Sequence, residues 1–294
     1  MFFKVNAKLQ QLRHFITLES LIMNKRTVIS VLGCGWLGFP LAQQLAENGF
    51  FVRGSTTSTE KLKSLSEKNI DPFLVQFNPH YTSGRGKEFF NCDIIIVTIP
   101  PKKEYDLFLL QMQELSKIIL EYRIPNTIFI SSTGVYGDIN TEVDEYSIPR
   151  PDTISGKSML AAEELFLGKA FQTTIIRFGG LIGPGRHPGR FFSGKKDIPN
   201  GKAPVNIIHL DDCIGIIEKV IQKDSWNKIY NACAPQHPSR KDFYTAAAAD
   251  AGLPLPKFKD ELQKWKIVNS RNTPEFLNYQ FKCDLKKLFK AREK

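Results

Sequence analysis

The chain has 294 residues and carries 40 lysines and arginines against 30 aspartates and glutamates, which gives a formal net charge of +10. Its five cysteines are widely separated and include no CxxC pair, so the sequence excludes a disulfide-framework protein, predicts no metal site and is typical of a reduced, cytoplasmic protein. The basic residues are dispersed, and this favours an anionic small molecule as the partner over nucleic acid or a membrane.

Residues 1–22 differ from the rest of the chain. Charged residues, among them Lys4, Lys8 and Arg13, interrupt the apolar ones, so the segment predicts neither a secretion signal nor a membrane span. A short amphipathic helix is compatible with the pattern, but Met23 stands almost directly before the first predicted strand. We therefore expect residues 1–22 to be a disordered or mis-assigned extension.

The first predicted strand, residues 27–32, is apolar and rich in β-branched residues, and a glycine-rich loop, a helix and a second strand follow it. In such a unit the first glycine permits a tight turn, the second lets backbone N–H groups approach a pyrophosphate, and the third lets the helix pack on the strand. The order of these elements favours dinucleotide binding over an ordinary glycine-rich turn. The predicted cofactor residues of the loop are Gly33, Cys34, Gly35, Trp36, Leu37 and Gly38.

The thiol of Cys34 has two interpretations. Close to a helix N-terminus it could be acidic and reactive, or the residue could simply be small enough for the loop.

The second predicted strand, residues 50–52, is not followed by the aspartate or glutamate that would bind the adenosine ribose. Arg53, Ser55 and Thr56 follow instead, and they offer a cation and hydroxyl groups to a 2′-phosphate. The same polar run is also suited to capping the next helix, and the two roles are compatible. The sequence thus favours NADP as the cofactor, with NAD as the alternative.

Further elements are predicted in chain order: strands at residues 71–77, 93–99 and 127–130, and a helix over residues 106–122. A doubly wound sheet binds its ligand at the carboxyl ends of its strands, so Thr98, Ile99 and Pro100 are expected to contact the cofactor. The alternation predicts an α/β protein, with a doubly wound parallel sheet over residues 23–179 and a smaller substrate lobe over residues 180–294.

Four later motifs arrive in order: SSTGVYG from Ser131, SGKSMLAAEEL from Ser155, IIRFGGLIGPGR from Ile175 and NIIHLDD from Asn206. With the glycine loop they resemble the extended short-chain dehydrogenase/reductase superfamily, in particular its NAD-dependent epimerase/dehydratase branch. The resemblance implies a Rossmann fold that binds NAD(P) and acts on a phosphorylated or nucleotide-linked sugar or carbonyl. It also implies a homodimer paired through the AAEEL helix.

The Tyr-x-x-x-Lys pair of that superfamily is missing from this chain. An alignment on Glu163 puts Ser155 at the tyrosine position and Met159 at the lysine position. A frame that uses Lys157 puts Thr153 at the tyrosine position instead. In the family the lysine lowers the pKa of the phenol, and loss of such an acid–base group typically slows a reaction by about 10²- to 10⁴-fold.

Three residues after the strand at 127–130 remain candidates for catalysis. The resemblance gives Ser132 the family's catalytic Ser/Thr position, Thr133 is its neighbour, and Tyr136 is the nearest phenol. Each of them also suits a structural role in a turn.

Arg177 and Arg186 flank a glycine-rich loop and are predicted to grip a phosphate or carboxylate, with Arg186 the better candidate. Asn206 is a further candidate for substrate binding. His209 is expected to be structural, beside a helix cap made by Asp211 or Asp212. Two functions stay open: an oxidoreductase or epimerase-type enzyme, and a non-catalytic NADP sensor or protein-interaction module.

Overall fold

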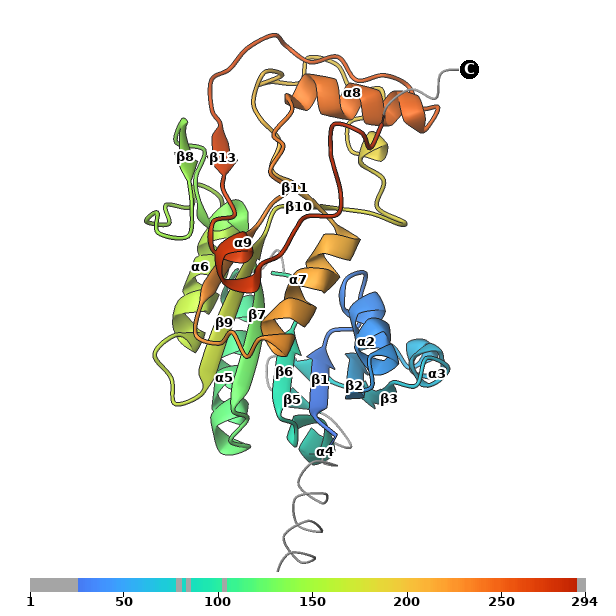
Figure 1. The fold of residues 1–294 in the computed structure, drawn as a ribbon, viewed down its shortest axis with the longest axis vertical. Coiled ribbons are helices and arrows are strands. Elements are labelled where there is room, and N and C mark those ends of the chain that lie inside the picture. Colours follow the sequence, from blue (N-terminus) through green and yellow to red (C-terminus); the bar gives the residue numbers. More distant parts are fainter. Residues whose placement is uncertain (1–25, 78–80, 83–85, 102–104, 290–294) are drawn as a thin grey trace, which may run out of the picture.

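The computed structural model describes residues 26–77, 81–82, 86–101 and 105–289 (Figure 1). The expectation for residues 1–22 lies outside these ranges. Within the described residues, no helix is long and apolar enough to cross a bilayer, and no group of three or more His, Cys, Asp or Glu residues is arranged to hold a metal ion.

A seven-stranded, fully parallel sheet forms the centre of the molecule, which confirms the predicted α/β class (Figure 1). Its order places the first strand between the two halves, as in a doubly wound sheet. In spatial order the strands are β12 (Ile229–Ala232), β9 (Gln172–Phe178), β7 (Asn126–Ser132), β6 (Ile94–Val97), β1 (Val28–Leu32), β2 (Phe51–Thr56) and β3 (Asp71–Leu74).

Helices cover both faces of this sheet. The core on one face includes residues of α2 (Gly38–Glu47), α3 (Glu60–Ser66) and α7 (Leu210–Gln222), and that on the other residues of α4 (Gly86–Phe90), α5 (Tyr105–Glu121) and α6 (Ile154–Phe166). The strand β6 supplies both cores, because Ile94 and Ile96 face the first layer while Ile95 and Val97 face the second. An apolar strand in a three-layer protein is thus buried on both sides.

A smaller lobe lies beyond the carboxyl ends of the strands (Figure 1). It contains β10 (Gly180–Ile182) paired with β11 (Ile207–His209), β8 (Thr141–Val143) paired with β13 (Lys266–Val268), and the helix α8 (Arg240–Asp250), whereas α9 (Asn272–Leu277) packs on β12 and α7 of the main domain. Short 3₁₀ helices η1 (Thr133–Val135) and η2 (Pro188–Arg190) connect these elements. The lobe has its own apolar cluster, which includes Ile182, Val205 and Phe243.

The chain returns to the main sheet after residue 179. The strand β12, expected in the smaller lobe, pairs with β9 at the sheet edge, and α7 packs on the same face as α2. The last segment then crosses α7, where the buried carboxylate of Asp212 accepts hydrogen bonds from the Tyr279 hydroxyl and the N–H groups of Lys282 and Cys283.

Several predicted strand boundaries are wrong. The second strand runs on to Thr56, and the strand predicted at 71–77 breaks at Val75 into β3 and β4 (Gln76–Phe77), which pairs antiparallel with β5 (Tyr81–Thr82). The strand β6 ends at Val97, so Thr98 and Ile99 belong to the following loop.

Candidate functional site

A cleft of about 660 Å³ lies at the carboxyl ends of the strands of the main sheet. This volume suits a small-molecule ligand. Its walls come from the glycine loop, the ends of β2, β6, β7 and β9, the first turns of α6 and the loop that carries Arg186. Every residue of the predicted glycine loop, from Gly33 to Gly38, lines it.

The three glycines of the loop meet different constraints. Gly33 has φ of +103°, a conformation that favours glycine. A Cβ atom on Gly38 would lie 2.3 Å from the Gly33 carbonyl oxygen, so the close approach of helix and strand requires glycine there. At Gly35 no atom lies within 4 Å of a Cβ position, so this residue leaves space open on the side of the cleft.

The N-terminus of α2 faces this loop without a side-chain cap. Leu37 is the N-cap residue, and its apolar side chain cannot accept a hydrogen bond from the N–H groups of the first turn. The first N–H groups of a helix have no partner within the helix, and they carry a partial positive charge. The arrangement suits the pyrophosphate of a dinucleotide.

Two hydroxyl groups hold the loop in shape. The Gly33 N–H donates to Ser55 Oγ at 2.9 Å, and Thr98 Oγ1 donates to the Gly33 carbonyl at 2.6 Å. Both residues line the cleft, as do Ile99, Pro100 and Thr56. The predicted cofactor residues at the ends of β2 and β6 are therefore brought together with the glycine loop, with one exception.

Arg53 is the exception, and its expected position was wrong. It lies in the middle of β2, opposite Ser30 of β1, and its guanidinium donates to the Asn91 carbonyl and stacks on Phe51, away from the cleft. The cation at this end of the cleft is Lys61 of α3, which sequence reasoning missed. The sequence could have indicated this position, because Lys61 is the second residue of the helix α3 that follows the strand β2.

The Cys34 thiol is structural rather than acidic. The side chain is buried, and desolvation raises its pKa to about 12, so it stays protonated. It packs close to Gly54, where a Cβ atom would lie 2.9 Å from the sulfur. The interpretation as a small residue that fits the loop agrees with this position.

On the other side of the glycine loop, Ser132 lines the cleft together with Ser155 and Met159 of α6. Ser132 Oγ accepts the Gly134 N–H at 3.1 Å, which leaves the hydroxyl proton free to be donated. Ser155 and Met159 lie one helical turn apart on the cleft side of α6. Thr133, by contrast, is buried and does not line the cleft.

Tyr136 does not reach the cleft, so the structure contradicts its candidacy as a catalytic acid. Tyr136 is 1% exposed, and the single proton of its hydroxyl is shared between the Asp144 carbonyl oxygen at 2.8 Å and Asn231 Oδ1 at 3.1 Å. Burial raises the pKa of the phenol, the wrong direction for an acid–base group near neutral pH.

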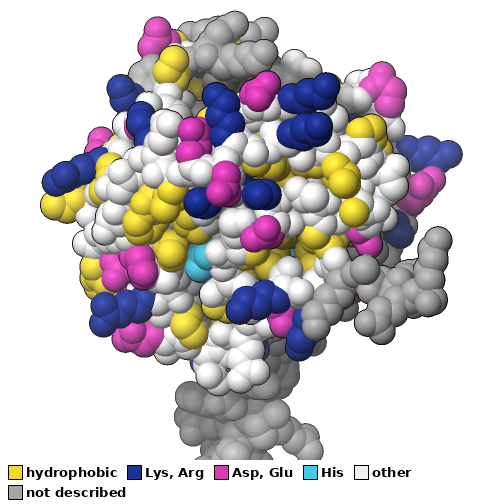
Figure 2. All heavy atoms as spheres, turned by 90° about the horizontal axis from the view of Figure 1, so that it is seen from above, with side chains coloured by type: hydrophobic (Ala, Val, Ile, Leu, Met, Phe, Trp, Pro, Cys, Tyr) yellow, Lys and Arg dark blue, Asp and Glu magenta, His cyan; other side chains and the backbone are white. Residues whose placement is uncertain are grey.

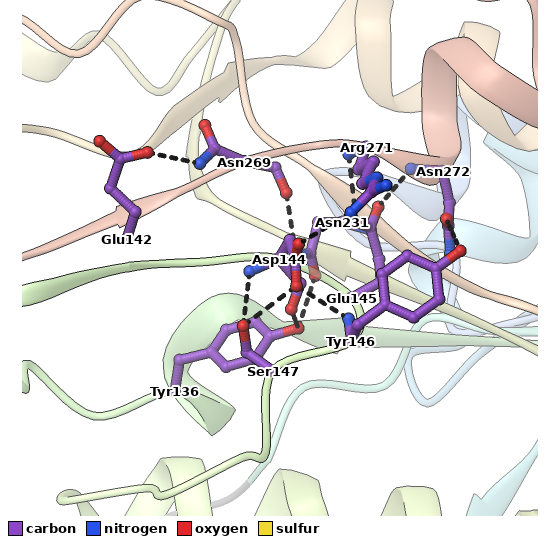
Figure 3. A network of polar contacts seen from close by, with 10 residues as sticks. All are labelled: Tyr136, Glu142, Asp144, Glu145, Tyr146, Ser147, Asn231, Asn269, Arg271 and Asn272. Atoms are coloured by element: carbon purple, nitrogen blue, oxygen red, sulfur yellow. Dashed lines mark hydrogen bonds and ion pairs between the residues drawn. The ribbon is translucent and has the colours of Figure 1, made fainter.

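The surroundings of Tyr136 form a polar network that joins three parts of the chain (Figure 3). Glu145 accepts the backbone N–H groups of Asn231, Arg271 and Asn272. The network therefore fixes the loop after β8 to β12 and to the start of α9, a structural role.

Arg177 is also structural. It is 3% exposed and forms a buried ion pair with Glu163 of α6 at 2.6 Å, and it donates to the Tyr136 hydroxyl at 2.7 Å. The Ser131 hydroxyl donates to the same carboxylate. A group engaged in this way is not available to bind a substrate.

Arg186, which the sequence predicts to be a substrate ligand, lines the cleft. Its guanidinium lies over the Trp36 ring, 5.6 Å from the centroid, and Trp36 Nε1 donates to the Pro184 carbonyl at 2.8 Å. The glycine loop and the loop of the smaller lobe are thus in direct contact.

Asn206 and His209 have structural contacts instead. The Asn206 amide donates to the Lys266 carbonyl and accepts the Val268 N–H, and it does not line the cleft, so its predicted role in substrate binding was wrong. His209 is itself the N-cap of α7, where Nδ1 accepts the Asp211 N–H. The histidine therefore makes the cap that was expected from an aspartate.

Charges of both signs alternate on the face of the molecule shown in Figure 2. Lys and Arg side chains lie among Asp and Glu side chains there, without a continuous basic patch. This face has no stripe of the kind that tracks a nucleic-acid backbone.

The comparisons with known proteins agree with this geometry. Residues 28–147 match a family described as the NAD binding domain of 6-phosphogluconate dehydrogenase. Protein YeeZ from Escherichia coli is 38% identical over 261 residues, which are 86% of this chain and 95% of that protein. Among solved structures, MoeE5 in complex with UDP-glucuronic acid and NAD has a TM-score of 0.73 at 18% identity, over 88% of this chain and 95% of that one.

A second solved structure is that of UDP-glucuronic acid 4-epimerase from Bacillus cereus in complex with NAD. It has a TM-score of 0.72 at 19% identity and covers 88% of this chain and 92% of that chain. At this level of identity the likeness shows a common fold.

Proposed function

Because this chain belongs to the same family as Protein YeeZ of Escherichia coli and has the fold of NAD-binding epimerases, we propose that it is an NAD(P)-binding oxidoreductase- or epimerase-like protein. The observation that carries the proposal is the glycine loop at the carboxyl edge of the sheet. Gly38 closes the loop onto the strand, while Gly35 leaves space for a pyrophosphate against an uncapped helix N-terminus.

The cofactor we propose is NADP. Thr56, Thr57 and Lys61 line the end of the cleft beside β2, and no Asp or Glu is among the described residues that line the cleft. A lysine ammonium and hydroxyl groups suit a 2′-phosphate, whereas NAD-specific sites carry a carboxylate for the ribose.

At the other end, Ser132 and Arg186 are the proposed substrate ligands. The free proton of the Ser132 hydroxyl would be donated to a carbonyl or alkoxide oxygen, and the Arg186 guanidinium would hold a phosphate or carboxylate. A bound nicotinamide would supply the hydride. The substrate class that fits is a phosphorylated or nucleotide-linked sugar or carbonyl.

Ser155 and Met159 favour a second candidate function. Neither side chain supplies a group that ionises near neutral pH, so the cleft side of α6 carries neither a phenol nor an ammonium at these two positions. A non-catalytic NADP-binding sensor or interaction module would need neither group.

Calorimetric titration with NADPH and NADH tests the cofactor site. We expect NADPH to bind more tightly, and Lys61→Ala to weaken NADPH about tenfold while NADH binding is unchanged. Arg53→Ala is the matched control, because that cation points away from the cleft and its loss should leave both affinities unchanged. If NADH binds as tightly as NADPH or more tightly, the proposed cofactor is NAD rather than NADP. If neither dinucleotide binds, the proposed function is overturned.

A measurement of substrate turnover distinguishes the two candidate functions. The enzyme predicts a change in cofactor absorbance with nucleotide-linked sugars or phosphorylated carbonyls, slowed about 10²-fold or more in Ser132→Ala with NADPH affinity unchanged. The sensor predicts tight NADPH binding with no turnover on this panel, and an association with another protein that depends on the cofactor.

A further inference from the structure

The side chains that line the cleft carry charges of one sign. Lys61 and Arg186 are the charged side chains among the described residues of its walls, which include no aspartate or glutamate. The Cys34 thiol stays protonated and neutral, because burial raises its pKa to about 12. The uncapped N-terminus of α2 adds a partial positive charge at the glycine loop. The described walls of the cleft are therefore electropositive.

The charge of Arg186 is not balanced by a carboxylate. The residue is exposed, and its guanidinium forms neither an ion pair nor a hydrogen bond within the part of the chain that the structure describes. It lies instead over the face of the Trp36 ring, which leaves its N–H donors free. The positive charge of Arg186 thus acts on whatever occupies this part of the cleft.

The buried carboxylate behind Ser131 does not offset this charge. Ser131 lines the cleft, and its hydroxyl donates to Glu163 at 2.5 Å. Glu163 in turn pairs with Arg177 at 2.6 Å, and both side chains are buried. The pair has no net charge, so the cleft gains no negative field from it.

The two redox forms of a nicotinamide dinucleotide differ in charge. When the reduced ring gives a hydride to a substrate, the ring is left with a positive charge, so NADP⁺ carries one positive charge more than NADPH. The function proposed above places the ring at the end of the cleft where Ser132 and Arg186 lie. Two like charges in one partly dehydrated site repel each other more strongly than they do in bulk water.

We propose that Arg186 makes this site selective for the reduced dinucleotide, by repulsion of the oxidised ring. The proposal rests on the dinucleotide-binding function proposed above, and it holds for both candidate functions because it concerns binding rather than turnover. In the enzyme, NADPH loads in preference to NADP⁺, and NADP⁺ leaves more readily after hydride transfer. In the sensor, the occupancy of the site follows the ratio of NADPH to NADP⁺.

The test is calorimetric titration of the whole protein with NADPH and with NADP⁺ at low ionic strength. We expect the wild type to bind NADPH about three- to tenfold more tightly, the effect of one unit charge in a partly hydrated site. In Arg186→Gln the ratio of the two affinities should fall to about one, because the amide is neutral. Arg186→Lys should retain the preference, because it keeps the charge. NADH and NAD⁺ differ by the same charge and serve equally if NAD is the cofactor.

Arg190→Gln is the matched control, since Arg190 is an exposed arginine four residues further along the chain and does not line the cleft. Its ratio of affinities should equal that of the wild type. Added salt should shrink the ratio in the wild type and leave it unchanged in Arg186→Gln, because salt screens an exposed charge. A preference that came from the shape of the ring would not respond to salt in this way.

Each outcome decides the proposal. A wild type that binds NADP⁺ as tightly as NADPH, or more tightly, overturns it, and this comparison does not depend on whether a variant folds. A preference that persists undiminished in Arg186→Gln, or that is lost equally in Arg190→Gln, also overturns it. If the wild type binds no nicotinamide dinucleotide, the dinucleotide-binding function has itself failed, a result distinct from binding without a redox preference.

Discussion

At the scale of single residues, the shape of the cleft depends on two glycines, which have no side chain, as much as on the side chains that line it. Gly38 and Gly35 are both glycines of one loop, but only Gly38 has a neighbouring backbone atom where a Cβ would stand. The sequence pattern assigns both to the loop and gives no sign of this difference. The two positions therefore separate the requirements of folding from those of binding.

Gly38→Ala is expected to destabilise the protein, because the new Cβ atom would overlap the Gly33 carbonyl oxygen. Overpacking of this kind costs about 1–3 kcal/mol of the free energy of unfolding. Gly35→Ala should leave that free energy unchanged and weaken dinucleotide binding. Urea denaturation and NADPH titration of both variants check this, and equal stability losses in the two would contradict it.

The same scale shows which of the predicted site residues lie at the cleft and which do not. The glycine loop, Thr98, Ser132 and Arg186 were predicted from local motifs and line the cleft. The position predicted for Arg53 was wrong because the polar run from Arg53 to Thr56 is typical of a loop, although these residues continue the strand β2. Ser55 is polar inside a strand because its buried hydroxyl accepts the Gly33 N–H, a contact across 22 residues that no local pattern contains.

At the scale of secondary structure elements, α6 is joined to the sheet by a buried charge. Glu163 of α6 and Arg177 of β9 pair at 2.6 Å with side chains 1% and 3% exposed. The order of the strands and helices was predictable from periodicity, since each apolar strand alternates between the two faces of the sheet. The pairing of Glu163 with Arg177 was not, because a charged residue in a helix is most often solvated.

Glu163→Gln should lower the free energy of unfolding by about 3–5 kcal/mol, because it leaves the Arg177 guanidinium buried without a counter-charge. Glu67→Gln is the control, since it removes one partner of the exposed Lys63–Glu67 pair of α3, which contributes little. Chemical denaturation of both variants measures the difference. Similar small losses in the two would show that the buried pair is not required.

At the scale of the whole molecule, the last part of the chain is attached to the fold through Asp212. Its carboxylate is fully buried and accepts hydrogen bonds from residues 67 to 71 positions later in the sequence. The doubly wound class was predictable from the alternation of elements. The return of β12 to the sheet and this crossing of α7 were not, since both depend on contacts between segments far apart in the sequence.

Asp212→Asn should loosen the crossing segment, because an amide nitrogen cannot accept the bonds that a carboxylate oxygen accepts. The expected loss is about 1–3 kcal/mol of the free energy of unfolding, with faster hydrogen exchange of the amides of Lys282 and Cys283. Asp211→Asn is the neighbouring control, since the Asp211 side chain is 65% exposed. Unchanged protection of the two amides in Asp212→Asn would contradict the attachment.

The contact between Trp36 and Arg186 has a thermodynamic consequence. One residue belongs to the loop proposed to bind the dinucleotide and the other to the loop proposed to bind the substrate, and the indole lies under the guanidinium. If binding of one ligand moves either side chain, it changes the binding free energy of the ligand at the other site, and this coupling is reciprocal. Whatever factor the first ligand imposes on the affinity for the second, the second must impose on the affinity for the first, so the two proposed binding sites would form one linked equilibrium.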